Sequence, residues 1–361
     1  MTSLIKSTSD MARMPRTSAI SRVIQSIFEV HRVVRGFIHS VYTRPHAEKR
    51  NGVALLLQRP NRVCNHWQMT TSTIYQPIVP RRERSYALRG VDYVVGEWGE
   101  PDAPLVVYLH GWADAGSTFQ FVVDQLAGPW RVVAPDWRGF GQSKCECRSY
   151  WFPDYLADLH ALLEIYSPER PVRLIGHSMG GNIASLYAGA MAERVAALVN
   201  VEGFGLIDSN PADAPRHYRD WLQAEALTPE FSRYADFDAL AHRVRKRSPG
   251  MSAAAAAFVA RQWATEEADG HIRLRADPRH KLPNPVLYRR AEAKACWAAT
   301  VADVMLVAGA QSSFADRYAG SADDVYPEAE RRVIPAAGHM LHFEAPAALA
   351  AVIEDFFGHT L

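Results

Sequence analysis

Six short apolar runs, separated by helix-like stretches, constrain the fold of this 361-residue chain more than any other feature. They occupy residues 104–111, 131–139, 172–178, 195–203, 303–310 and 331–339. Runs that are apolar at nearly every position indicate strands buried on both faces, and helical connections indicate parallel neighbours. Just before them, residues 86–90 and 91–99 predict a β-hairpin with Gly90 at its turn. The chain therefore predicts an α/β fold, a mostly parallel twisted sheet with helices on both faces.

One connection in this pattern is much longer than the others. About a hundred residues separate the runs at 195–203 and 303–310, far more than a crossover helix needs. Most of this interval has helical patterning, interrupted by a proline-rich stretch. We therefore predict a helical cap at residues 208–300, inserted before the penultimate strand. The core is then expected to consist of residues 69–207 and 301–361.

The first 68 residues differ from the rest in charge, with eleven basic residues against three acidic ones. Between residues 20 and 41, apolar positions recur at helical spacing with arginines interleaved. This pattern is compatible with a transit peptide or a membrane-surface helix. The alternative that we favour is a basic extension outside the folded domain, which would begin near Met69. Charged residues interrupt the apolar positions, so no secretory signal is predicted.

Composition argues against several classes of protein. A formal net charge of +1 lacks the basic excess that nucleic-acid binding needs. The sequence contains no run of about eighteen uncharged apolar residues, so no transmembrane helix is predicted. Of the four cysteines, Cys145 and Cys147 form a lone C-x-C, which falls short of a zinc pattern. We expect no metal, no disulfide scaffold and a cytoplasmic, reducing compartment, with a transit peptide left open.

The sequence around Ser178 predicts a nucleophile. Glycines lie two residues before and two residues after it, at a point where an apolar run gives way to a helical pattern. Such a strand–turn–helix holds the serine in a strained, exposed position. The turn also places the Met179 amide at a helix N-terminus, where a developing negative charge is favoured. Trp112, which follows Gly111 after another strand, is expected to supply a second backbone amide to the same oxyanion.

A base must take the proton of such a serine. His339, directly after the last apolar run and behind Gly338, is the best placed of the fourteen histidines. His342 is the alternative. Asp136 and Arg138 also follow a predicted strand, and we interpret them mainly as residues that order their loop.

Four motifs in order make residues 87–357 resemble the α/β-hydrolase fold superfamily. They are H-G at 110–111, D-x-R-G-x-G-x-S at 136–143, G-H-S-M-G at 176–180 and G-H-x-x-x-x-E-x-P at 338–346. The resemblance implies that Ser178 is the nucleophile, that His339 is the base and that the helical insertion is a cap. A serine at this position argues against haloalkane dehalogenase and epoxide hydrolase activity, which use an aspartate there.

The chain departs from the family pattern at the acid. The usual acid follows the penultimate strand as G-x-x-D, but here Ser312 lies three residues after Gly309. A serine cannot carry the charge that stabilises the imidazolium, and losing that charge costs about four decades in rate in a serine protease. Glu202, at the end of the run 195–203, is the preferred substitute, and Asp316 is the alternative. The third possibility is that neither residue serves as the acid.

The sequence thus favours a serine hydrolase that cleaves an ester or related small acyl substrate through an acyl-enzyme, without a metal or organic cofactor. A C–C bond hydrolase with the same triad is the first alternative. A hydrolase-fold binding protein without turnover is the second, supported by Ser312 alone. Membrane-surface contact through the N-terminal extension is a further option for a partner, and the oligomeric state stays open.

Overall fold

The computed structural model describes residues 74–313 and 326–359. The predicted N-terminal extension and Asp316 therefore lie outside the described residues. Within them, nine strands form one sheet in the order β1-β2-β4-β3-β6-β7-β10-β11, with β5 paired to β2. The strands are β1 (Arg82–Leu88), β2 (Val91–Trp98), β3 (Leu105–Leu109), β4 (Arg131–Pro135), β5 (Lys144–Cys145), β6 (Val172–His177), β7 (Val195–Val201), β10 (Asp303–Gly309) and β11 (Glu330–Ile334).

The predicted apolar runs form the parallel part of this sheet. Strands β4, β3, β6, β7, β10 and β11 pair in parallel, whereas β2 runs antiparallel to β1 and β4. The β1–β2 connection is the predicted hairpin, and Arg89 and Gly90 at its turn have φ of 52° and 74°. Two positive φ values are what a tight two-residue hairpin turn requires. The prediction of a mostly parallel α/β sheet is confirmed.

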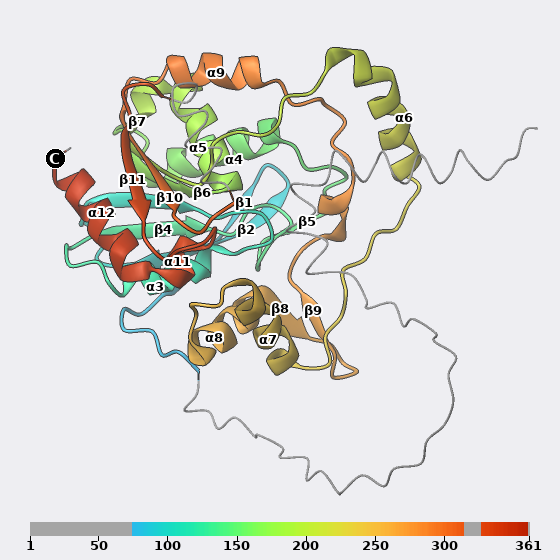
Figure 1. The fold of residues 1–361 in the computed structure, drawn as a ribbon, viewed down its shortest axis with the longest axis horizontal. Helices are drawn as coiled ribbons and strands as arrows, with labels where there is room; N and C mark the ends of the chain where they lie inside the picture. The colour runs from blue at the N-terminus through green and yellow to red at the C-terminus, as the bar shows by residue number, and fades with distance from the viewer. Residues whose placement is uncertain (1–73, 314–325, 360–361) are drawn as a thin grey trace, which may run out of the picture. The chain divides into compact units, whose positions relative to one another are not determined.

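Helices cover both faces of the sheet (Figure 1). One face packs against α4 (Phe152–Tyr166), α5 (Met179–Ala190) and α9 (Arg290–Ala298), and the other against α3 (Gln120–Val123), α11 (Leu341–Glu344) and α12 (Pro346–His359). Adjacent residues of β6 show the alternation, since Leu174 joins the first core cluster and Ile175 the second. Short 3-10 turns are η2 (Gly116–Phe119), η3 (Ala192–Arg194), η4 (Pro211–Asp213) and η5 (Pro278–Lys281).

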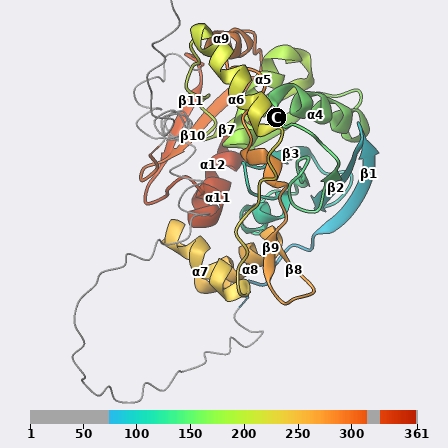
Figure 2. The same ribbon diagram turned by 90° about the vertical axis from the view of Figure 1, so that its right-hand side faces the viewer.

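The segment predicted as a cap is less uniform than expected. It contains α6 (Ala214–Ala224), α7 (Phe237–Arg247), α8 (Ala253–Trp263) and an antiparallel pair, β8 (Ala264–Glu266) and β9 (Ile272–Leu274). Helix α6 lies apart from the group formed by α7, α8 and β8–β9 (Figures 1 and 2). The helical pattern stops at Trp263 because the next residues pair with β9 across a turn at Gly270, whose φ is 80°. Helix α9 packs against α5, so the end of the predicted range covers the sheet.

No helix in the ranges 74–313 and 326–359 is long and apolar enough to cross a membrane.

Candidate active site

Ser178 occupies a sharp turn between β6 and α5. Its φ of 51° lies in the left-handed region, which non-glycine residues adopt at an energetic cost. Gly180 makes this turn possible, because a Cβ there would lie 2.0 Å from the carbonyl oxygen of Leu109. The Ser178 N–H donates to the carbonyl of Val201 at 2.8 Å, which ties the turn to the end of β7. The surrounding strands thus hold Ser178 at the carboxyl edge of the sheet, where ligands of such sheets bind.

A continuous hydrogen-bonded chain joins Ser178, His339 and Glu202. His339 Nε2 lies 3.1 Å from Ser178 Oγ, and His339 Nδ1 lies 3.0 Å from Glu202 Oε2. These residues come from different strand ends, since Glu202 directly follows β7 and His339 lies between β11 and α11. The Glu202 side chain is fully buried, whereas 16% of the His339 side chain is exposed. With Nδ1–H donating to the carboxylate, His339 Nε2 is left to accept the serine hydroxyl proton.

Glu202 has further contacts besides His339. Its backbone has a φ of 60°, and its N–H donates to the carbonyl of Val307 at 3.0 Å. Its Oε1 accepts the Gly309 N–H at 2.8 Å, and its Oε2 accepts the Ser312 hydroxyl at 2.6 Å. A buried carboxylate needs such donors, because desolvating it without partners is costly. Of the two predicted acids, the described residues place Glu202 beside His339, and Asp316 lies outside them.

The residues predicted to supply oxyanion amides follow the carboxyl ends of two neighbouring strands, β6 and β3. Met179 is the first residue of α5, and Trp112 follows the end of β3. Gly111 runs close to the nucleophile turn, since a Cβ on it would lie 3.3 Å from Ser178 Cβ. Ala113 then turns the chain with a φ of 56°. The backbone at Gly111, directly before Trp112, therefore passes beside the serine.

A second carboxylate–histidine pair, Asp114 and His342, lies in the same region. His342 Nε2 is 3.1 Å from Asp114 Oδ2, and Thr118 and Trp263 each donate to Asp114 Oδ1 at 2.8 Å. Burial alone would raise the pKa of Asp114, but the hydrogen bond with His342 and the neighbouring histidines lower it to about 2. Ser178 Oγ is contacted by His339, whereas His342, the alternative base, lies on α11 paired with Asp114.

Asp114, His177 and His342 form the one three-residue group in the described ranges that could approach a metal ion. Burial holds the pKa of His177 well below its usual value, so this imidazole is neutral. Its Nε2–H donates to the carbonyl of His339 at 2.8 Å. Because the oxygens of Asp114 already accept three hydrogen bonds, we assign the group a structural role. It connects the loop after β3 to the loop that carries His339.

Comparison with known proteins identifies the family of the chain. The model of the α/β hydrolase fold family matches residues 104–346. The chain belongs to this family. A serine hydrolase-like protein of the zebrafish Danio rerio is 28% identical over 272 residues, covering 72% of this chain and 83% of the relative.

Solved structures also resemble this α/β hydrolase. The thioesterase domain from the curacin biosynthetic pathway has a TM-score of 0.70 and 26% identity, covering 76% of this chain and 99% of that chain. An esterase of Mycobacterium tuberculosis, with a TM-score of 0.58 and 20% identity, covers 77% of this chain and 92% of its own. At that identity the esterase shows a shared fold alone.

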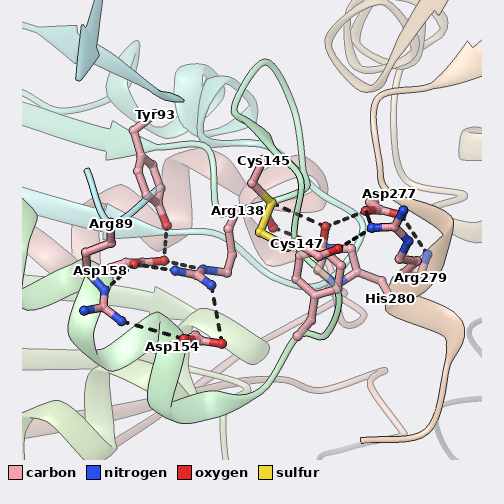
Figure 3. Close-up of a disulfide and its surroundings, with 11 residues drawn as sticks. Arg89, Tyr93, Arg138, Cys145, Cys147, Asp154, Asp158, Asp277, Arg279 and His280 are labelled. Atoms are coloured by element: carbon pink, nitrogen blue, oxygen red, sulfur yellow. Dashed lines mark hydrogen bonds and ion pairs between the residues drawn. A yellow bond between two sulfur atoms is a disulfide. The ribbon is translucent and has the colours of Figure 1, made fainter. Parts of the chain in front are cut away.

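Two charged residues of the D-x-R-G segment organise loops in this α/β hydrolase. Asp136 accepts the N–H groups of Gly116 and Gln142, each at 2.8 Å. Arg138 donates to both oxygens of buried Asp158, at 2.5 and 2.7 Å (Figure 3). Charge-assisted bidentate bonds of this kind fix side-chain orientation. The prediction that Asp136 and Arg138 mainly order their loop is confirmed.

The sequence predicts no disulfide scaffold, but the structure joins Cys145 and Cys147 in one disulfide (Figure 3). Their Cα atoms are 5.2 Å apart, within the usual range for a disulfide. Cys145 ends β5 and Cys147 follows it two residues later, and a C-x-C pattern does not signal that two such residues pair. Nearby, the Tyr150 hydroxyl donates to Asp277 Oδ2 at 2.7 Å, which links the core to the predicted cap segment. The cysteines therefore no longer argue for a reducing compartment.

Sequence reasoning missed the residues that support the Ser178–His339–Glu202 chain. The residue type of Ser312 signals only a missing acid, although its place in the family pattern indicates a position close to the histidine. The Asp114–His342 pair had no signal at all, because 228 residues separate its members.

Proposed function

We propose that this α/β hydrolase is a serine hydrolase that cleaves an ester or related acyl substrate, thioesters included, through an acyl-enzyme. The observation that carries the proposal is the chain from Ser178 Oγ through His339 to Glu202 Oε2, with distances of 3.1 and 3.0 Å. Acyl transfer needs a nucleophile, a base and an orienting acid within hydrogen-bond reach. The resemblance to a serine hydrolase-like protein and to a thioesterase domain supports the same chemistry.

In the proposed acylation step, Ser178 Oγ attacks the substrate carbonyl carbon while its proton passes to His339 Nε2. Glu202 stays ionised and stabilises the imidazolium. The N–H groups of Met179 and Trp112 donate to the oxyanion that forms on the carbonyl. When this tetrahedral intermediate collapses, His339 gives the proton to the leaving alkoxide or thiolate, and the acyl group remains on Ser178.

Deacylation repeats the sequence with water. His339 Nε2 takes a proton from a water molecule, whose oxygen attacks the acyl carbon. Collapse of the second intermediate returns the proton to Ser178 Oγ and releases the carboxylic acid. This chemistry uses no metal ion or organic cofactor, and it consumes only the acyl substrate and water.

The segment 208–300 is proposed to act as a cap over this site. Its residues reach the loop after β3: the Phe231 and Trp112 rings have centroids 6.4 Å apart, and Trp263 donates to Asp114 at 2.8 Å. Contacts of this kind place apolar groups beside the expected oxyanion loop. They favour a substrate with an apolar acyl group.

Covalent labelling tests the proposal. We expect a fluorophosphonate probe to label the wild type at Ser178 and to leave Ser178→Ala unlabelled, as read by intact-protein mass spectrometry. Hydrolysis of p-nitrophenyl esters and acyl thioesters of matched chain lengths then defines the preferred substrate. A folded wild type that is neither labelled nor active would indicate a binding protein. Labelling without ester or thioester hydrolysis would instead favour C–C bond cleavage.

A further inference from the structure

We infer that Ser312, which occupies the position where the family pattern has its acid, is a positioning residue for the acid Glu202. This inference rests on the proposed function. Ser312 follows β10, and its N–H closes a turn onto the carbonyl of Gly309 at 3.0 Å. Its hydroxyl is 2.6 Å from Glu202 Oε2, the same oxygen that lies 3.0 Å from His339 Nδ1.

The contacts of Glu202 show why a positioning residue is needed. Glutamate has one more rotatable bond than aspartate, so fixing its side chain costs more rotamer entropy. Gly309 N–H holds Oε1 at 2.8 Å while the Ser312 hydroxyl holds Oε2. With the Gly309 donor on Oε1, and the Ser312 donor beside His339 on Oε2, the carboxylate cannot rotate without breaking a hydrogen bond. Both donors come from the end of β10, so this strand supplies the support for an acid that β7 carries.

The Ser312 hydroxyl also stabilises the negative charge of the Glu202 carboxylate. Ser312 is 7% exposed and the Glu202 side chain is fully buried, so water contributes little to solvating the carboxylate. Hydrogen bonds to a charged group are worth more than neutral ones, and they are strongest in a dry site. The benefit is largest when His339 becomes an imidazolium, because only a correctly oriented carboxylate stabilises that charge. Loss of the hydroxyl should therefore lower kcat and leave KM almost unchanged.

The test is a double-mutant cycle on ester hydrolysis, with enzyme concentrations set by fluorophosphonate titration. We expect Ser312→Ala to lower kcat about tenfold with KM within about twofold of wild type. Ser312→Thr, which keeps the hydroxyl, should recover most of this loss. In a Glu202→Gln background, Ser312→Ala should change kcat less than about threefold, because the carboxylate that it positions is gone.

Ser143→Ala is the matched control, since Ser143 is also a buried serine with two hydrogen bonds, to the Asp136 carbonyl and from the Val94 N–H. We expect it to lower the unfolding midpoint without changing kcat. The inference is overturned if Ser312→Ala keeps full kcat, if it loses as much in the Glu202→Gln background, or if Ser312→Thr is equally slow. Each of these results leaves the proposed function standing, whereas an active Ser178→Ala enzyme would remove that function itself.

Discussion

Two carboxylate–histidine pairs with a buried carboxylate, both in the described part of the chain, have nearly equal geometry. Glu202 and His339 are 3.0 Å apart, and Asp114 and His342 are 3.1 Å apart. The pairs differ in what the rest of the imidazole meets. His339 is partly exposed and its second nitrogen lies 3.1 Å from Ser178 Oγ, whereas the His342 side chain is 1% exposed. A buried acid–imidazole contact is therefore no sign of catalysis by itself, and the serine at the second nitrogen makes the difference.

The largest expected effect is the loss of activity when the acid of the Glu202–His339 pair is replaced. We expect Glu202→Gln to lower kcat by about 10³- to 10⁴-fold, because the amide cannot carry the charge that stabilises the imidazolium. Steady-state hydrolysis of a p-nitrophenyl ester measures it. Asp316→Asn is the control and should stay close to wild type. If Asp316→Asn shows the large loss and Glu202→Gln does not, the acid is Asp316.

For stability we expect the Asp114–His342 pair to matter more than the Glu202–His339 pair. We expect Asp114→Asn to lower the free energy of unfolding by roughly 3 kcal/mol, because breaking a buried pair leaves polar groups without a partner. Its kcat should fall by at most about tenfold, since the nucleophile contacts the other pair. Urea unfolding and ester hydrolysis on the same preparations measure both. A large loss of kcat with unchanged stability would contradict the structural role of Asp114.

The stability that Asp114 contributes should depend on pH in the acid range. The pKa of Asp114 is lowered to about 2 from an ordinary value of 3.8. A depressed carboxyl pKa stabilises the folded state above the unfolded pKa, and this stability is lost as pH falls from about 4 to about 2. The contribution is about 2 kcal/mol. Unfolding midpoints of wild type and Asp114→Asn should therefore converge over this window, and a constant difference between them would contradict the assignment.

The smallest expected effect tests whether the proposed triad acid can be supplied from the end of β10 instead of the end of β7. Ser312 Oγ is 2.6 Å from the carboxylate oxygen that His339 contacts, so an aspartate at 312 would place an oxygen close to the same point. In a Glu202→Gln background we expect Ser312→Asp to raise kcat about tenfold. A further decrease would show that the two strand ends are not interchangeable in this chain.

Much of the fold could be predicted from local patterns. The strands β3, β4, β6, β7 and β10 were visible as apolar runs because burial on both faces leaves little room for polar residues, whereas the edge strand β11 is buried only at Ile334. The β8–β9 pair was not visible in the sequence. Its strands have only three residues each, and they are defined by pairing with each other rather than by an apolar run. The disulfide escaped for a similar reason, since it depends on the direction that the chain takes after β5.

For the site, the sequence by itself determined which residue types follow which strands. That is why Ser178 and His339 could be named, and why Glu202 and Asp316 stood as the candidate acids. Only the tertiary structure decided which side chains meet. Neighbouring strands β7 and β10 come from positions about a hundred residues apart, and their alignment places Glu202 between Ser312 and His339. A hydrogen bond forms only when its donor–acceptor distance is right to within a few tenths of an ångström. Packing of the whole sheet sets those distances.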